Sequence, residues 1–193
     1  MRLDSLQCLG PHGFHRLAYV DWGKAGADHV VICAPGLTRN ARDFDFLARR
    51  LAPRCRVVCM DVAGRGRSDW LANKADYGFD LYQSDAAALI ARVTAPARRS
   101  LLAWLRGLLP GRARRVDWVG TSMGGLIGMA LAAQPNTPVR RFVINDAGPV
   151  IAKVSLASTF HGSCACETAT LVLSGAPARA RNLSSTASVA STL

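Results

Sequence analysis

The sequence predicts an α/β fold in which a mostly parallel sheet is flanked by helices. Apolar runs of strand length alternate with segments of helical periodicity, which is typical of parallel sheets with right-handed crossovers. Two runs, residues 29–34 and 55–60, are almost continuously apolar, as strands buried on both faces are. A third, residues 116–119, leads through a glycine-rich turn into a helical pattern at 126–131. The 193 residues suffice for one domain with a proper core.

The N-terminal part is predicted to form an antiparallel strand or hairpin. Residues 14–22 mix β-branched, aromatic and polar side chains, a composition that favours a strand. His12 and His15, near its start, are expected at the surface or in a turn rather than in a catalytic role. After the apolar run at 29–34 and a loop, residues 41–52 are expected to form a helix. The predicted apolar face of that helix consists of Phe44, Leu47 and Leu51.

The middle of the chain adds a glycine-rich loop and a long helical region. The run at 55–60 leads into residues 62–69, which are not a dinucleotide fingerprint because no G-x-G-x-x-G opens a helix there. A helical pattern extends from about Asp80 to Leu109, and Pro96 is expected to divide it into two helices. The apolar face of the first of these consists of Ala86, Leu89, Ile90 and Val93. Further along, residues 139–146 predict another strand.

A basic amphipathic segment precedes the third apolar run. Residues 96–115 interleave arginines with leucines and a tryptophan. A surface insertion is the preferred interpretation, and contact with a membrane surface is the alternative.

Residues 120–125, Gly-Thr-Ser-Met-Gly-Gly, are the most informative stretch of the chain. They form a G-x-S-x-G motif between a predicted strand and a predicted helix, the context that gives this motif its meaning. Gly120 and Gly124 lack the Cβ atoms that would clash where strand and helix approach. The turn is expected to project the Ser122 hydroxyl above the sheet, at the positive end of the following helix. A glycine-rich turn with an incidental serine is the alternative.

Several polar or glycine-containing segments follow predicted strand ends. They are residues 35–37, residues 61–68, Ser122 and Asp146. Because ligand sites of parallel sheets gather at the carboxyl ends of the strands, we expect these segments to converge.

The charge and hydropathy of the chain indicate which kinds of partner and which compartment to expect. The formal net charge of +11 is mostly arginine, but the arginines are spread along the whole chain with aspartates interleaved, and no nucleic-acid motif is present. Solvated basic faces are therefore expected rather than a nucleic-acid surface. No stretch is long and apolar enough for stable membrane insertion, and the N-terminus lacks the apolar core of a signal peptide.

Six cysteines are present, and their placement favours a reducing cytoplasm. Cys33, Cys55 and Cys59 fall within apolar runs, where cysteine behaves as a small hydrophobic residue. No spacing gives a convincing metal site; Cys164 and Cys166 are a weak candidate.

Four motifs together resemble those of a known family. They are C-A-P-G-L-T-R-N at 33–40, D-V-A-G-R-G-R-S-D-W at 61–70, V-G-T-S-M-G-G at 119–125 and V-I-N-D-A-G-P-V at 143–150. Over residues 18–151 their order and spacing are similar to those of a bacterial α/β-hydrolase of the serine type. The motifs are specific for the fold and much less so for a substrate.

The resemblance implies an α/β-hydrolase fold in which Ser122 is the nucleophile. It implies an oxyanion hole built from the backbone N–H groups of Met123 and Leu37. Where the family usually has His-Gly, this chain has Pro35-Gly36, and Leu37 can still donate. The implied reaction is hydrolysis of an ester, thioester, lactone or activated carbon–carbon bond of a small acyl substrate, through an acyl-enzyme and with no cofactor or metal.

The family's acid and histidine, which follow the serine in the chain, are not matched. Asp146 is the candidate acid, with capping of the turn after its strand as the alternative. His161 and Glu167 lie beyond the matched motifs and are weaker candidates. A catalytically inactive hydrolase fragment or a binding protein is therefore the alternative function. A basic nucleic-acid or membrane-surface binder is a third interpretation. Oligomeric state stays open.

The composition changes after the last motif. We expect residues 1–151 to be the N-terminal portion of a hydrolase core and residues 152–193 to be a Ser/Thr/Ala-rich, poorly ordered tail, in which 170–175 favour one short strand. The fold is thus expected to be incomplete on its C-terminal side. The abrupt change suggests a truncated or frame-shifted reading of a longer gene, which resequencing of the locus would test.

Overall fold

A seven-stranded sheet forms the centre of the molecule in this computed structural model, which describes residues 1–95, 114–146 and 170–174. The strand order is β1-β2-β4-β3-β5-β6-β7. The bounds of the strands are β1 Arg2–Gly10, β2 Gly13–Trp22, β3 His29–Ala34, β4 Arg56–Met60, β5 Arg115–Thr121, β6 Val139–Asn145 and β7 Thr170–Ser174.

The four central strands, β4, β3, β5 and β6, run parallel, whereas the outer strands pair antiparallel. At one edge β1 and β2 form a hairpin that is hydrogen-bonded to β4. At the other edge β7 pairs antiparallel with β6. The predicted mostly parallel core and the early hairpin are confirmed, and the strand predicted at 170–175 lies beside β6 as expected.

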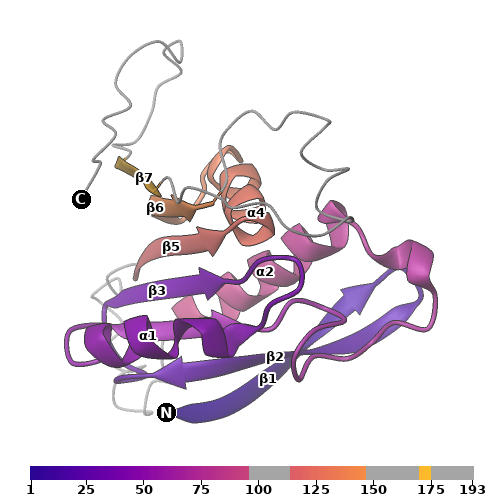
Figure 1. Cartoon of the computed structure of the whole chain (residues 1–193), viewed down its shortest axis with the longest axis horizontal. Coiled ribbons are helices and arrows are strands. Elements are labelled where there is room, and N and C mark those ends of the chain that lie inside the picture. Colours follow the sequence, from indigo (N-terminus) through magenta and orange to yellow (C-terminus); the bar gives the residue numbers. More distant parts are fainter. Residues whose placement is uncertain (96–113, 147–169, 175–193) are drawn as a thin grey trace, which may run out of the picture.

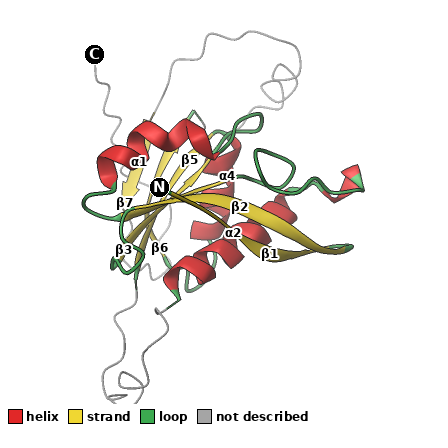
Figure 2. Ribbon diagram, turned by 90° about the horizontal axis from the view of Figure 1, so that it is seen from below, coloured by secondary structure: helices red, strands yellow, loops and turns green. Residues whose placement is uncertain are grey.

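Helices cover both faces of this sheet (Figures 1 and 2). The helical elements are η1 Ala41–Phe44, α1 Asp45–Leu51, η2 Lys74–Asp76, α2 Phe79–Thr94 and α4 Met123–Ala132. Residues of η1 and α1 pack with Val31, Val57 and Cys59 on one face. Side chains of α2 and α4 pack with Val30, Val58 and Trp118 on the other, where the larger core lies.

The helix α2 has the apolar face that its periodicity predicts, since Ala86, Leu89, Ile90 and Val93 are all buried. The remainder of the predicted helical region, residues 96–113, lies outside the described residues.

Two predictions about individual residues are wrong. The helix expected at 41–52 is a 3-10 turn followed by α1, and this change of pitch rotates the face: Ala48 is buried while Leu47 is 37% exposed. His15 is 4% exposed rather than at the surface, because its strand position faces α2. His12 does lie in the hairpin turn and is exposed.

Candidate hydrolase site

Ser122 lies between the end of β5 and the start of α4. Its backbone has φ 48° and ψ −115°, a strained conformation for a residue with a side chain. Its N–H donates to the carbonyl oxygen of Asn145 at 2.8 Å, and its carbonyl oxygen accepts from the Gly125 N–H at 2.8 Å. These two bonds fix the residue at the carboxyl ends of β5 and β6.

The glycines on either side of Ser122 are required by close backbone approaches. A Cβ atom on Gly120 would lie 2.3 Å from the carbonyl oxygen of Gly124. One on Gly124 would lie 2.1 Å from the carbonyl oxygen of Ala34, at the end of β3. Beneath the turn, the indole of the fully buried Trp118 donates to the Gly124 carbonyl oxygen at 2.9 Å. The strand–turn–helix geometry expected from the G-x-S-x-G motif is therefore present.

The loop after β3 lies directly against this turn. A Cβ atom built on Gly36 would be 3.6 Å from the Cβ of Ser122. The loop is held by a turn in which the Arg39 N–H donates to the Gly36 carbonyl oxygen at 3.1 Å. Leu37 is thus close to the turn, and Met123 is the first residue of α4, where backbone N–H groups have no partner within the helix.

Asp146 follows β6 directly and occupies the same edge of the sheet as Ser122. Its backbone has φ 59° and its side chain is exposed. The other residues considered for the triad, His161 and Glu167, lie outside the described residues.

Each of the three histidines in the described part of the chain pairs with a carboxylate. His12 contacts Asp76 at 2.8 Å, His15 contacts Asp85 at 2.9 Å, and His29 contacts Asp117 at 2.6 Å. The described hydrogen bonds join none of them to Ser122.

In the loop after β4, the side chains of Asp61 and Ser68 make structural hydrogen bonds that the sequence motif did not predict. The carboxylate of Asp61 accepts from the Ala41 N–H at 2.7 Å and from the Arg67 N–H at 2.8 Å. The Ser68 hydroxyl donates to the Asp61 carbonyl oxygen and accepts from the Ala18 N–H. These bonds tie the loop to the hairpin and to η1. The motif at 61–70 places this loop at the strand ends, but it does not reveal these hydrogen bonds.

A cavity of about 540 Å³ lies beside the loop after β3. Its walls come from the loops after β3 and β4 and from α2. They include Leu37, Arg39, Arg65, Trp70 and Tyr82. A space of this size, with aromatic and cationic walls, suits a small organic ligand.

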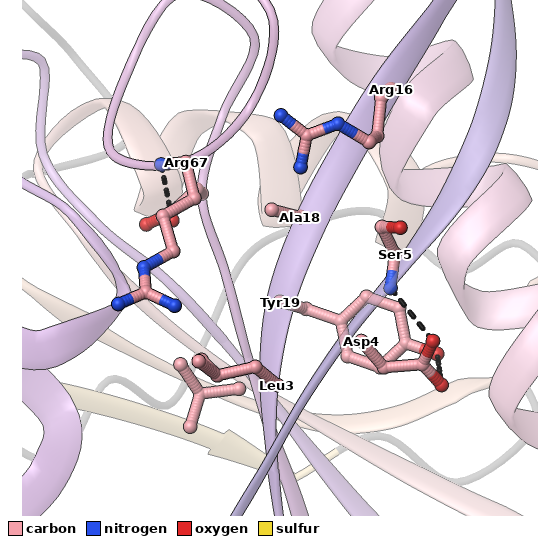
Figure 3. Close-up of a pocket in the computed structure, with 9 residues that line it drawn as sticks. Leu3, Asp4, Ser5, Arg16, Ala18, Tyr19 and Arg67 are labelled. Atoms are coloured by element: carbon pink, nitrogen blue, oxygen red, sulfur yellow. Dashed lines mark hydrogen bonds between the residues drawn. The ribbon is translucent and has the colours of Figure 1, made fainter.

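A smaller cavity of about 210 Å³ lies on the hairpin side (Figure 3). Arg16 and Arg67 project beside the strand residue Ala18, and Asp4 accepts from the Tyr19 hydroxyl at 2.9 Å. Ser122 lines neither of these two cavities; the larger one adjoins it through Leu37, whereas the smaller one lies against the hairpin.

The alpha/beta hydrolase family model matches residues 31–190. The chain belongs to the alpha/beta hydrolase family. The fold class predicted from the motifs is therefore confirmed.

Among curated relatives, this α/β-hydrolase is 48% identical over 151 residues to a 3-hydroxybutyrate-oligomer hydrolase of Cupriavidus necator, a match covering 78% of this chain and 45% of that protein. An uncharacterised protein of Mycobacterium tuberculosis is 28% identical over 152 residues, which cover 79% of this chain and 38% of that protein. The chain thus spans less than half the length of these relatives.

Solved structures agree with this assignment. A putative hydrolase from Rickettsia typhi has a TM-score of 0.68 and 27% identity, over 82% of this α/β-hydrolase and 52% of that chain. An alpha/beta hydrolase from Novosphingobium aromaticivorans has a TM-score of 0.62 and 34% identity, over 81% of this chain and 48% of that chain. In the described residues of the present chain, the helices are too short or too polar to cross a bilayer.

Proposed function

We propose that this α/β-hydrolase cleaves ester bonds with Ser122 as the nucleophile. The observation that carries the proposal is the strained backbone of Ser122, φ 48° and ψ −115°, at a strand-to-helix turn. The Ser122 oxygen attacks the ester carbonyl carbon, the alcohol leaves, and water then hydrolyses the acyl-enzyme. The N–H groups of Met123 and Leu37 stabilise the negative charge that develops on the carbonyl oxygen. This reaction needs no metal or cofactor.

The proposed substrate class is a short ester of a hydroxy acid. Its support is the 48% identity to a 3-hydroxybutyrate-oligomer hydrolase, over 45% of that protein's length. The cavity beside Leu37 adds support, since Trp70 and Tyr82 offer apolar contact for a short acyl chain and Arg39 offers charge for a terminal carboxylate. Thioesters and lactones share the acyl chemistry and are the next substrates to test.

The activating base of the proposed reaction lies outside the described residues. A serine hydrolase needs a histidine oriented by a carboxylate, and three of the chain's four histidines pair with carboxylates elsewhere. His161 is the fourth. We propose it as the base and Asp146, which follows β6, as the acid.

Labelling with a fluorophosphonate probe tests the nucleophile. Folded wild-type chain is expected to take up one probe, and Ser122→Ala is expected to take up none. Ser84→Ala is the matched control, because Ser84 is an exposed serine of α2 and its loss leaves labelling unchanged. Labelling that persists in Ser122→Ala would show that another residue reacts. A His161→Gln variant that labels at the wild-type rate would refute the proposed base.

A second candidate function is binding without catalysis. It is favoured by the pairing of every described histidine with a carboxylate rather than with Ser122. Under this alternative the wild-type chain stays unlabelled although circular dichroism shows that it is folded. It would then bind 3-hydroxybutyrate esters without turnover, as isothermal titration calorimetry can measure.

A reducing cytoplasm is the proposed location. Cys33 and Cys59 are direct neighbours on β3 and β4, yet both are free thiols, as are Cys8 and Cys55. Disulfide formation at such closely placed cysteines is suppressed where thiols are kept reduced.

A further inference from the structure

Three buried side chains of different chemistry meet between the hairpin and α2. Cys8 of β1 and His15 of β2 are direct cross-strand partners, so their side chains lie on the same face of the hairpin. Asp85 of α2 lies opposite them. One ligand atom from each of the three lies within 4.8 Å of the other two. They are 3%, 4% and 0% exposed, and Cys8 belongs to the larger hydrophobic core.

His15 and Asp85 are hydrogen-bonded to each other through one atom each, and the second polar atom of each side chain is not used in this bond. His15 Nε2 contacts Asp85 Oδ2 at 2.9 Å. His15 Nδ1 and Asp85 Oδ1 are buried and have no hydrogen-bond partner among the residues that the structure describes. Unpartnered polar atoms in a core cost free energy, and two in one cluster indicate that a further group belongs there.

We propose that Cys8, His15 and Asp85 form a structural binding site for Zn²⁺. Thiolate, imidazole and carboxylate are all ligands of zinc, and ligand atoms bonded to one Zn²⁺ at about 2.0–2.3 Å lie within roughly 4 Å of one another. Calcium and magnesium prefer oxygen ligands only, so a site with sulfur and nitrogen discriminates against them. On binding, the Cys8 thiol releases its proton to solvent and the imidazole stays neutral. Within the described part of the chain, Asp85 Oδ1 has no hydrogen-bond partner and is available as a further ligand.

The site would fasten the hairpin to the helix layer. Its three ligands come from β1, β2 and α2, and β1 and β2 lie at the edge of the sheet, outside the parallel core. Zinc would add a cross-link between the hairpin and α2, and because it binds the folded chain, it would stabilise that chain against unfolding. Since the ligands are buried, the ion has to enter during folding.

The test uses the full chain, without a polyhistidine tag, refolded with Zn²⁺ and then freed of unbound metal by gel filtration. A reference variant, Cys164→Ser/Cys166→Ser, removes the thiols of the tail. Elemental analysis of this variant is expected to find about one Zn²⁺ per chain. Adding Cys8→Ala to it should weaken zinc binding by at least about tenfold. Removing a residue that only hydrogen-bonds to a metal ligand already costs that much, and Cys8 is itself a proposed ligand. Adding Cys55→Ala, which removes another buried thiol, should leave zinc binding unchanged.

Two further measurements do not depend on the folding of a ligand variant. Refolding the reference variant with Co²⁺ should give a thiolate-to-metal charge-transfer absorption of the strength of one thiolate. Its Tm should be higher after refolding with Zn²⁺ than with a chelator. A folded reference variant that takes up no zinc would overturn the proposal. So would zinc uptake that survives Cys8→Ala, or a cobalt spectrum with more than one thiolate.

Discussion

The guanidinium of Arg65 donates from Nε to the carbonyl oxygen of Leu37 at 2.6 Å. The same group donates from Nη1 to the Ala63 carbonyl oxygen at 2.8 Å and contacts the Tyr82 hydroxyl at 3.0 Å. It also lies 5.3 Å from the centre of the Tyr82 ring. One arginine thus joins the loop after β3, the loop after β4 and the helix α2. It therefore restrains the segment that contains the proposed oxyanion donor Leu37.

Replacing Arg65 by Met is expected to slow fluorophosphonate labelling of Ser122 by about 10- to 100-fold, because a displaced oxyanion donor stabilises the transition state less. The control is Arg42→Met, since Arg42 is a nearby exposed arginine that does not line the cavity and whose described ion pair is with Asp45. Circular dichroism checks that both variants are folded. Equal labelling rates in Arg65→Met and wild type would show that Arg65 does not position this loop.

A methyl group at Gly124 is expected to destabilise the fold by about 3 kcal/mol, the upper end of the usual cost of overpacking. The added Cβ would lie 2.1 Å from the Ala34 carbonyl oxygen and 2.8 Å from that of Pro35, and neither is a side chain that can move away. Urea unfolding of Gly124→Ala measures the loss. Gly26→Ala is the control, because its Cβ meets no atom within 4 Å. Similar unfolding midpoints for the two variants would contradict the close approach described above.

The central strands and the turn at Ser122 could be predicted because their signals are local. The apolar runs that became β3 and β4 are continuous, and the G-x-S-x-G motif contains the two glycines that the backbone contacts require. In the same way α2 repeats its apolar residues at helical spacing over 16 residues. Each of these features is decided by neighbours in the sequence.

The environment of His15 could not be predicted because its partner is remote. His15 and Asp85 are 70 positions apart, and only the packing of α2 against the hairpin brings them together. The loops that contain Leu37 and Arg65 were expected to converge, but the sequence does not reveal that these two residues are hydrogen-bonded to each other. The exposure of Leu47 has another cause, since the short 3-10 turn before α1 shifts the helical phase in a way that residue spacing does not reveal.

Replacing Arg56 alone by a neutral residue is expected to lower the free energy of unfolding more than replacing both Arg56 and its partner Asp21. Arg56 and Asp21 are 8% and 3% exposed and share two hydrogen bonds, of 3.0 and 3.1 Å. Arg56→Met leaves a buried carboxylate whose remaining described ion pair is with Arg2, a residue exposed to solvent, and should lower the free energy of unfolding by about 3 kcal/mol.

The double variant Arg56→Met/Asp21→Asn should recover part of that loss, because no unpaired charge then stays buried. Urea unfolding of wild type, both single variants and the double variant gives the coupling energy. Additive losses in the two single variants would show that the pair is not coupled.

The ion pairs of Asp117 should make stability depend on pH in the acidic range. Asp117 accepts from Arg141 Nη2 at 2.6 Å and contacts His29 Nε2 at 2.6 Å. Burial raises the pKa of Asp117, but the hydrogen bonds from Arg141 and His29 outweigh it and hold the pKa of this carboxyl below its ordinary value. A carboxyl with a lowered pKa stabilises the fold above its unfolded-state pKa.

The stabilisation by Asp117 is therefore lost as the pH falls through the lowered pKa of the folded state. At pH 7, Asp117→Asn should be less stable than wild type by about 1 kcal/mol, a modest value because Arg141 is largely exposed. The difference should shrink once the pH falls below about 4 and vanish when the wild-type carboxyl is protonated. Urea unfolding of both proteins between pH 7 and pH 3 measures this. A difference that stays constant, or grows, on acidification would mean that Asp117 stabilises the fold through packing rather than through its charge.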